Sequence, residues 1–451
     1  MKRALFALLV VLAFGLAVAQ QTEVRVIAFA QGFAWPELFG ESGTEKTDLL
    51  REFEEREGIT VTIEWGDETA VRQKVLTDLI SGAGRYDVIL LGSDGAVQTY
   101  GFGGFLEPLD EHLASGAYDK YFNDEDIYPQ FLDANRIDGV LYGLPYYSFG
   151  PGIIYRTDLF DRYSIEVPTT TDELEAALER LKEGFVEDGI TDVYPLTMRG
   201  APGEEPSLDL AGFVYAYAGY PAWFEGGATS AEEIREARAQ PIFTGDFRPG
   251  FEAFVRLARD YGPPGISTHT WVDMMNLYAQ GRAAVLLPSA INGYAAITFT
   301  ENEEVRENSA FAPIVKGPSG ERIQSFWTFS LGVPQASQRK EAALTVLTFL
   351  TGQRAMQAFA DRTQWPSVTM PSVMHSEVLI NRWGEAEIRL NEEAVMLSNP
   401  FYFPYIPELA EFMDRIGTAA SRAISTGDVD AALNELQTWA LERMHAAGYY
   451  R

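Results

Sequence analysis

The sequence predicts an α/β protein with at least two sheet-containing units. Near the N-terminus, three short apolar runs, at 24–29, 61–65 and 87–92, alternate with two amphipathic segments. Continuous apolar strands separated by helices are typical of a parallel sheet that is covered on both faces. A second α/β unit begins near Val167, and a length of 451 residues allows two or three domains.

Helical periodicity marks the segments between the first three strands. We expect the apolar positions of each segment to face the sheet, because they recur at the spacing of one helical face. These positions are Leu49, Leu50 and Phe53 in the first helix, and Val71, Val75, Leu76, Leu79 and Ile80 in the second.

Two more strands are expected at 139–147 and 152–156, on either side of a break at 148–151, and a second α/β unit begins after them near Val167. The next helix should begin at Thr170, because Thr170 and Glu173 match a capping box. Its inward stripe consists of Leu174, Ala177, Leu178 and Leu181.

The stretch 261–285 combines a Pro-Pro-Gly corner with a helix that Trp271 and Asp273 enter. Gly281 ends this helix, and the apolar run at 283–287 predicts a buried strand. The residues able to cap the helix are Ser267, Thr268 and Thr270. Beyond this stretch, the sequence predicts one more strand at 325–334, a helix bearing Leu344, Leu347 and Leu350, and a helical region from about Asn399.

The first nineteen residues have the pattern of a secretory signal peptide. Lys2 and Arg3 precede an apolar segment at 4–16, and Ala17-Val18-Ala19 matches a cleavage site. We therefore assign 1–19 to the signal and expect an exported, soluble mature chain. No later run approaches the ~18 apolar residues of a membrane-spanning helix.

The composition indicates in which compartment the protein acts and which classes of partner it can bind. The chain has no cysteine, so the exported protein must be held together by its core and has no cysteine to carry a lipid anchor. A bacterial periplasm fits these properties best. The net charge of −30 repels phosphate backbones and argues against nucleic acid as a partner. The four histidines have no metal-ligand spacing, so we expect no metal and no cofactor.

Several strings resemble, in order, the bacterial extracellular solute-binding proteins of sugar ABC importers. They lie at 71–92, 142–161, 261–285 and 405–424, and together with shorter matches they extend over essentially the whole mature chain. Within that family, PLTMRGAPGEE at 195–205, the Pro-Pro-Gly corner and the helix containing Ile-Pro-Glu are most similar to the sugar-alcohol branch, whose members bind mannitol or sorbitol.

The resemblance implies a two-lobed periplasmic binding protein fold, of type II-like topology, that closes on a ligand between its lobes. Three crossovers would lie near 147–152, 327–329 and 365–366. The N-lobe would then comprise 21–147 plus 328–366, and the C-lobe 148–327 plus 367–451. The resemblance also implies a monomer without catalytic residues that delivers its ligand to the transmembrane subunits of a permease.

Three positions depart from the sugar-alcohol branch. The branch has a Tyr-Glu pair where this chain has Ser93-Asp94, and a Trp-x-Asp motif in the region of 286–289. The family's Tyr-Asn near the first crossover is here Tyr155-Arg156. Two carboxylates that read hydroxyl groups are therefore missing or moved.

A sugar or polyol offers hydroxyl groups for charge-assisted hydrogen bonds and C–H patches for aromatic faces. We expect carboxylates, an arginine and tryptophans to form its site. The candidate residues, chosen for their place at strand ends, helix starts or crossovers, are Trp35, Asp94, Arg199, Trp271, Asp273, Trp327, Trp365 and Glu408.

Every candidate except Asp273 also has a structural interpretation. Trp35 and Trp271 could pack within their own lobes, and the tryptophans at the crossovers, Trp327 and Trp365, could pack at the hinge. Asp94 and Glu408 could cap helices. Arg199 could form a salt bridge with one of the two glutamates at 204–205.

Two other functions remain open from the sequence. A secreted glycoside hydrolase needs two carboxylates flanking a bond, and 65 acidic residues make such pairs easy to find and uninformative. A ferric-iron binder of similar two-lobed build is suggested by the tyrosine pairs at 146–147 and 449–450, although packing explains both pairs more simply.

Overall fold

The computed structural model describes residues 22–29, 35–66, 68–92, 95–149, 152–219, 222–288, 290–323, 327–401 and 403–450. The predicted signal peptide and the candidate Asp94 therefore lie outside the described residues. Within the described part of the chain, no helix is both long enough and apolar enough to cross a membrane.

The first lobe is built around a five-stranded sheet with the order β2-β1-β3-β11-β6. Strands β1, β2 and β3 run parallel, whereas β11 runs antiparallel to both of its neighbours, β3 and β6. The strands are β1 (Thr22–Phe29), β2 (Ile59–Gly66), β3 (Val88–Leu91), β6 (Leu144–Phe149) and β11 (Trp327–Gly332). The parallel sheet predicted for the N-terminal part is therefore present, with a late strand inserted into it.

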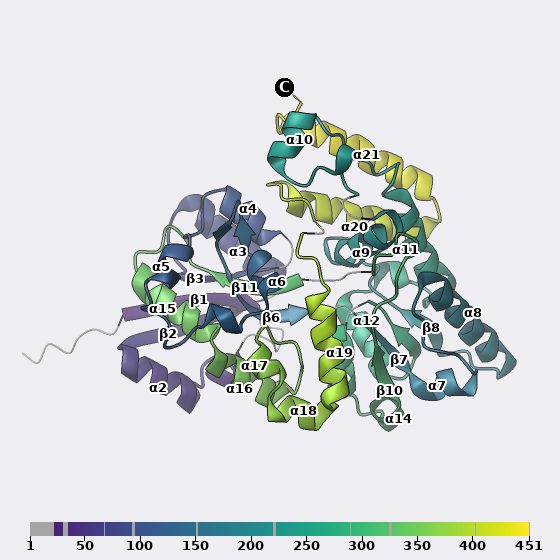
Figure 1. Ribbon diagram of the computed structural model, residues 1–451, viewed down its shortest axis with the longest axis horizontal. Helices are drawn as coiled ribbons and strands as arrows, with labels where there is room; N and C mark the ends of the chain where they lie inside the picture. Colours follow the sequence, from purple (N-terminus) through teal and green to yellow (C-terminus); the bar gives the residue numbers. More distant parts are fainter. Residues whose placement is uncertain are drawn as a thin grey trace, which may run out of the picture.

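Helices cover this sheet on both sides (Figure 1). They are α1 (Pro36–Phe39), α2 (Asp48–Glu57), α3 (Glu68–Ser81), α4 (Ala96–Phe102), α5 (Asp110–Ala114), α6 (Pro129–Asp133), α15 (Lys340–Leu350) and α16 (Gln353–Thr363), with a small hairpin of β4 (Arg136–Ile137) and β5 (Val140–Leu141). The inward stripe predicted for α3 is partly wrong. Its buried apolar side chains are Val71, Val75 and Leu79, whereas Leu76 and Ile80 are exposed because they lie about 100° further round the helix.

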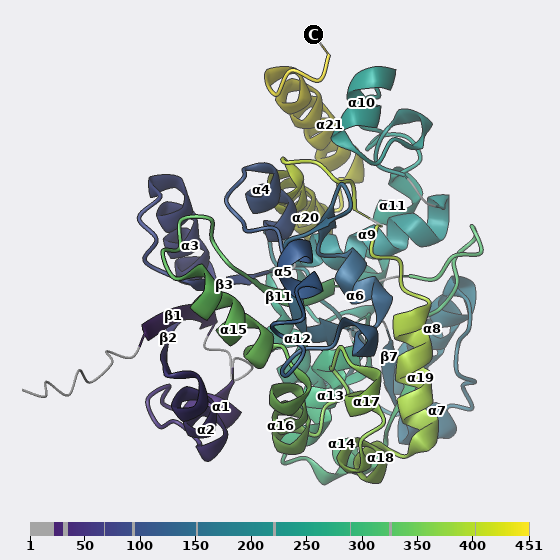
Figure 2. The same cartoon turned by 60° about the vertical axis from the view of Figure 1, so that its left-hand side comes forward.

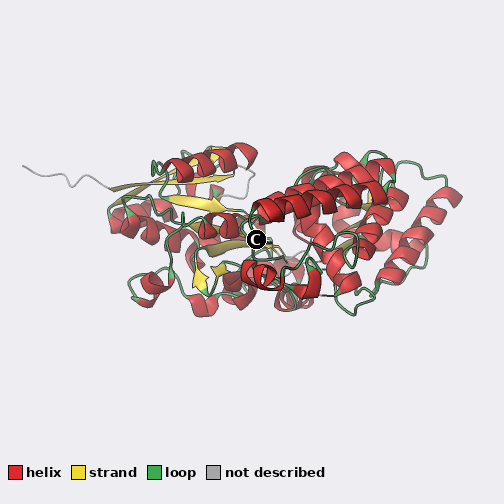
Figure 3. Cartoon of the chain, turned by 90° about the horizontal axis from the view of Figure 1, so that it is seen from above, coloured by secondary structure: helices red, strands yellow, loops and turns green. Residues whose placement is uncertain are grey.

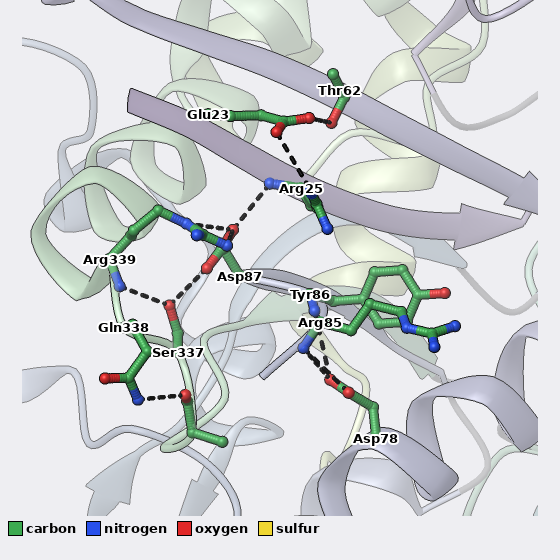
Figure 4. A network of polar contacts seen from close by, with 11 residues as sticks. Glu23, Arg25, Thr62, Asp78, Arg85, Tyr86, Asp87, Ser337, Gln338 and Arg339 are labelled. Atoms are coloured by element: carbon green, nitrogen blue, oxygen red, sulfur yellow. Dashed lines mark hydrogen bonds and ion pairs between the residues drawn. The ribbon is translucent and has the colours of Figure 1, made fainter. Parts of the chain in front are cut away.

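A polar network fixes the end of the first sheet at which β3 begins (Figure 4). Asp87, which is fully buried, accepts a hydrogen bond from the Arg25 backbone N–H at 3.0 Å and one from Ser337 Oγ at 2.7 Å. The Arg339 guanidinium adds Nε and Nη2 contacts to the same carboxylate at 3.1 and 2.9 Å. One aspartate therefore joins strands β1 and β3 to the segment between β11 and α15.

The second lobe is built around a four-stranded sheet with the order β10-β7-β9-β8. Strand β9 runs parallel to β8 and antiparallel to β7, and β10 runs antiparallel to β7. The strands are β7 (Ile153–Arg156), β8 (Tyr194–Thr197), β9 (Ala283–Leu286) and β10 (Ser309–Ala312). The strand predicted at 139–147 was wrong as a single element, because the chain there forms β5 and then β6.

The helices of the second lobe include the predicted α8, which begins with a capping box of Thr170 and Glu173 and buries the expected stripe from Leu174 to Leu181. They are α7 (Thr157–Arg162), α8 (Thr171–Glu187), α9 (Glu205–Ala218), α10 (Ala231–Ala237), α11 (Arg248–Tyr261), α12 (Trp271–Ala279), α13 (Ala290–Phe299), α14 (Glu303–Glu307), α20 (Leu409–Thr426) and α21 (Val429–Ala446).

Three further helices bridge the two lobes (Figure 1): α17 (Pro371–Met374), α18 (Glu377–Trp383) and α19 (Glu385–Met396). In α19, Glu392 accepts a hydrogen bond from the Tyr128 hydroxyl of the first lobe at 2.9 Å. Glu387, in the same helix, accepts one from the Tyr294 hydroxyl of the second lobe, also at 2.9 Å. Seen from above, the molecule is elongated, with the two helix-covered lobes at its ends (Figure 3).

The direction of the strands brings two sheet edges face to face. Strands β1, β2, β3 and β6 all end at one edge of the first sheet, because β6 runs in the same direction as β3. Strands β8 and β9 end at the edge of the second sheet where β7 begins. Only residues 150–152 separate β6 from β7, so these two edges, here called the facing edges, lie opposite each other.

Candidate ligand-binding site

Arg199 lies at the facing edge of the second lobe, two positions after β8 ends at Thr197. Its side chain is fully buried and forms a bidentate pair with Asp209 in α9, which is also fully buried. Arg199 Nε donates to Asp209 Oδ2 at 2.7 Å, and Nη2 donates to Oδ1. This pair holds the guanidinium charged and in a fixed orientation, because two parallel bonds define its plane.

Trp271 is the first residue of α12, as the sequence predicted, and is half-buried. Thr270 and Asp273 form a capping box in front of it, in which Asp273 Oδ2 accepts from the Thr270 backbone N–H at 2.9 Å and from its hydroxyl at 2.8 Å. These bonds hold the pKa of Asp273 below its ordinary value of 3.8. The Asp273 carboxylate, a candidate ligand contact, therefore takes part in starting the helix.

The segments that carry Arg199 and Trp271 are joined by backbone hydrogen bonds. The N–H groups of Gly200 and Ala201 both donate to the His269 carbonyl at 2.9 Å. A Cβ atom at Gly200 would lie 2.3 Å from the Ile266 carbonyl oxygen, so only glycine permits this approach. Two candidate residues separated in the sequence are thus brought to the same part of the second lobe.

His269 is a residue that the sequence reasoning missed. Its Nδ1 atom is buried without a hydrogen-bond partner in the described part of the chain. Burial lowers the pKa of His269, because the charged imidazolium is disfavoured away from water. A neutral imidazole next to the Arg199 segment can donate or accept a hydrogen bond, but a lone histidine without metal-ligand spacing gave no sequence signal.

The facing edge of the first lobe carries a cluster of aromatic rings, here called the aromatic cluster, formed by Phe29, Trp35, Tyr146, Tyr147 and Phe329. Trp35, which is 2% exposed, lies with its ring centroid 4.5 Å from that of Tyr146. Phe329 lies 5.5 Å from Phe29 and 6.0 Å from Tyr147. The candidate Trp35 is therefore packed within its own lobe, in a left-handed conformation with φ of 52°.

The remaining candidates lie elsewhere. Trp365 is 1% exposed and packs between the lobes, with its ring against Phe359 and Phe299 and its Nε1 donating to Thr298 at 3.3 Å. The backbone of Trp327 pairs with Phe149 in the sheet, and its side chain is outside the described part.

Glu408 precedes α20 but makes no capping hydrogen bond, so the capping interpretation was wrong. Its Oε2 accepts from the Tyr449 hydroxyl at 2.9 Å, and its Oε1 lies 3.8 Å from Arg443. Its carboxylate therefore ties the last residues of the chain to α20.

The tyrosine pairs that suggested iron are occupied with packing and hydrogen bonds. Burial raises the pKa of Tyr147 well above its ordinary value, and its ring packs against Phe329 and Phe359. The Tyr450 hydroxyl donates to the Ala239 carbonyl at 3.0 Å. No cluster of three or more acidic, histidine or cysteine residues suited to a metal is found in the described residues.

Two sheet-containing lobes, joined so that their strand ends face each other and carry aromatic and charged side chains, define a two-lobed solute-binding protein. Comparison with known proteins places the chain in a family. It belongs to the bacterial extracellular solute-binding proteins, whose family model matches residues 34–357. The fold class and the family predicted from the sequence are confirmed.

Among curated relatives, the mannitol-binding protein of Pseudomonas aeruginosa is 26% identical over 406 residues, covering 85% of this chain and 86% of its own. The erythritol/L-threitol-binding protein of Mycolicibacterium smegmatis is 23% identical over 327 residues, or 68% of this chain and 64% of its own.

Among solved structures, an ABC transporter solute-binding protein of Agrobacterium radiobacter K84 in complex with ribitol has a TM-score of 0.78 at 19% identity, covering 93% of this chain and 98% of its own. One of Agrobacterium vitis S4 with bound D-mannitol has a TM-score of 0.74 at 21% identity, covering 95% and 99%.

Proposed function

We propose that this protein captures a sugar or sugar alcohol between its two lobes and delivers it to the membrane permease of an ABC importer. The observation that carries the proposal is the pairing of facing edges, one bearing Arg199 and Trp271 and the other bearing the aromatic cluster. Arginine N–H groups bind hydroxyl oxygens, and aromatic faces cover C–H patches. The relatives named for mannitol and for erythritol favour an acyclic polyol within this class.

The contacts of the second lobe support distinct roles for its residues. Arg199, held by Asp209, would donate to hydroxyl groups, and the half-buried Trp271 would cover an apolar ligand face. His269 would read one further hydroxyl through its neutral ring. Asp94 would supply a carboxylate from the first lobe, a role that still stands as predicted.

The other candidates would act through packing. Trp35 and Trp365 are almost completely buried, and the carboxylates of Asp273 and Glu408 take part in hydrogen bonds within the protein. We propose that these four residues shape the facing edges and that direct ligand contact is concentrated on Asp94, Arg199, His269, Trp271 and Trp327.

The cellular setting follows the same proposal. The protein would be exported through a signal peptide cleaved after Ala19 and would act in the periplasm as a monomer, binding its ligand without catalysis. The lobes would follow the predicted boundaries, 21–147 with 328–366 and 148–327 with 367–451. The strands observed at 144–149 and 327–332 extend the first sheet slightly beyond those limits.

A thermal-shift screen tests the function directly. The panel contains D-mannitol, ribitol, erythritol, D-tagatose and maltose, with amino acids and ferric iron as controls. Ligand in hundredfold excess over Kd should stabilise the protein by about 2.7 kcal/mol, which raises the melting temperature by a few degrees. Stabilisation by iron or an amino acid, with no carbohydrate active, would overturn the proposal. Release of sugar from glycosides would point to the hydrolase instead.

A further inference from the structure

An ion pair joins the two lobes at their facing edges. Arg72 belongs to α3, which begins directly after β2 ends, and Glu204 immediately precedes α9 in the loop that follows β8. Arg72 Nη1 lies 2.8 Å from Glu204 Oε1. Each residue therefore follows the carboxyl end of a strand of its own sheet, and the bond between them joins the two facing edges.

The surroundings make this pair stronger than an ordinary surface contact. The side chains of Arg72 and Glu204 are 23% and 29% exposed, so water and salt screen their attraction only in part. The Arg72 guanidinium also lies 6.0 Å from the centre of the Phe29 ring, within the aromatic cluster. This ring limits the positions that the long arginine side chain can adopt.

A second contact between the lobes lies nearby. Gly95, at the start of α4, approaches Leu409, at the start of α20, so closely that a Cβ atom on the glycine would lie 3.0 Å from Leu409 Cγ. Helix α4 lies beside α20 in both views of the ribbon (Figures 1 and 2). In addition to the packing of Trp365, the lobes of this structure are thus in direct contact through the ion pair of Arg72 and Glu204 and through the apolar approach of Leu409 to Gly95.

The ionic contact is also connected to the candidate site. Glu205, the neighbour of Glu204 in the chain, accepts a hydrogen bond from the Trp271 backbone N–H at 3.2 Å. Since the two glutamates are consecutive, the bond to Arg72 and the support of α12 fix the same short segment. The contact between the lobes and the support of the first residue of α12 therefore depend on one short segment.

We infer that Arg72 and Glu204 form an interlobe latch that sets the affinity for ligand by stabilising the closed arrangement, without either side chain contacting the ligand. The inference rests on the proposed function. When a ligand binds only the closed protein, its apparent Kd equals the Kd for the closed form divided by the fraction of molecules that are closed. An ion pair that raises this fraction therefore lowers the apparent Kd.

Charge reversal tests the latch. In Arg72→Glu, two carboxylates meet across the lobes, and in Glu204→Arg two guanidinium groups do. Each variant should weaken D-mannitol binding at least fivefold in titration calorimetry at low ionic strength. The double variant Arg72→Glu/Glu204→Arg restores opposite charges and should return the Kd to within threefold of the original. The fivefold loss should shrink in high salt.

The chain supplies matched controls for both reversals. Lys74 lies on α3, as Arg72 does, but its Nζ pairs with Glu64 of the same lobe at 2.6 Å. Glu175 pairs with Arg256 within the second lobe at 2.8 Å. Lys74→Glu and Glu175→Arg change the net charge by the same amounts and should leave the Kd within twofold. Equal effects of control and latch variants would overturn the inference.

Failure of the latch and failure of the proposed function give different results. If the unmodified protein binds no carbohydrate in the screen, the proposed function is wrong. The latch is then tested by small-angle scattering of the ligand-free protein, in which each single reversal should enlarge the radius of gyration and the double reversal should restore it. If the unmodified protein binds D-mannitol and the single reversals bind equally well, the latch is wrong. A double reversal no better than the singles also overturns it.

Discussion

Asp209 and Arg199 form a pair in which neither side chain is exposed. A buried ion pair contributes little net stability compared with an apolar pair, but the loss of one partner leaves an uncompensated charge away from water. The pair therefore affects the free energy of unfolding mainly through the penalty for removing one partner. That cost favours a fixed guanidinium at the facing edge.

We predict that Asp209→Ala lowers the free energy of unfolding by about 3–5 kcal/mol. Urea unfolding followed by circular dichroism measures this change. Glu175→Ala is the control, because it removes a bidentate partner of Arg256 from a partly exposed pair and should cost only about 0–1 kcal/mol. A loss below about 1 kcal/mol for Asp209→Ala would mean that Arg199 is compensated elsewhere.

Glu387 gives stability a dependence on pH. Burial raises its pKa from 4.5 to about 6, and the hydrogen bond from Tyr294 opposes the rise. Because the folded pKa lies above the unfolded one, the folded protein binds this proton more tightly. Its contribution is fully present below pH 4.5 and is lost as the pH rises through about 6.

Glu387→Gln should therefore remove about 1–2 kcal/mol of this pH dependence, since an amide keeps the bond from Tyr294 and does not ionise. The measurement is the free energy of unfolding of both proteins at pH 4.5 and pH 8. Relative to the unmodified protein, the variant gains stability at the higher pH. Parallel pH profiles for the two proteins would contradict the prediction.

Helix α12 illustrates how a short element positions a single ring. Its capping box fixes the first turn, and Glu205 accepts a hydrogen bond from the Trp271 backbone N–H, so the backbone that carries the ring is held in place. The helix is secured on its other side by the buried Met274 and Tyr278. Trp271 therefore has a side chain that is partly accessible to solvent and a backbone that is held by the first turn of the helix.

Trp271→Ala is expected to weaken D-mannitol binding at least tenfold, which corresponds to ~1.4 kcal/mol, because it removes the ring that would cover the C–H face. Calorimetry on the variant measures the Kd, and melting of the ligand-free protein monitors the fold. Val272→Ala, a change at an exposed neighbour on the same turn, should bind normally. A Trp271→Ala protein with unchanged affinity and a lower melting temperature would place the ring in the core.

Local patterns predicted the elements better than they predicted contacts. The capping box at Thr170, the stripe from Leu174 to Leu181 and the start of α12 at Trp271 depend on neighbouring residues, and all three are present. The exposure of Leu76 and Ile80 depends on which part of α3 meets the sheet. Periodicity alone could not decide this, because an apolar stripe can be wider than the buried one.

The hydrogen-bond and packing partners of the candidate residues could not be predicted from the sequence either, because they depend on tertiary contacts. The structural alternative for Arg199 was a salt bridge with Glu204 or Glu205, yet its partner Asp209 lies a helical turn into α9. Trp35 and Glu408 were predicted as ligand contacts from their residue type and from their place after a strand or before a helix. In the structure Trp35 packs on Tyr146, and Glu408 accepts a hydrogen bond from Tyr449. Ring packing and buried ion pairs leave no periodic signal.

At the scale of the whole molecule, the two lobes are connected by the short link between β6 and β7, by the segment between β10 and β11, and by the helices α17–α19. Rigid lobes on such connections move by hinge rotation rather than by internal deformation. We therefore expect ligand to change the relation between the lobes and to leave each sheet unaltered.

Small-angle scattering should show a smaller radius of gyration when saturating D-mannitol is added, because ligand selects the closed arrangement. A carbohydrate that gives no thermal shift serves as the control and should leave the radius unchanged. Tight binding without any contraction would mean that the lobes are already closed in the free protein.

The position of β11 between β3 and β6 also dictates when the first lobe can fold. Ser337 Oγ reaches Asp87 from 250 residues further along the chain, and β11 fills the gap in a sheet whose other strands were all synthesised long before. Contacts of such separation slow folding, because the intervening chain must first be ordered. A nascent chain that ends before Trp327 should therefore remain open and sensitive to protease. Under the proposed export, which requires an unfolded chain, the delay would keep the protein competent for translocation until synthesis is nearly complete.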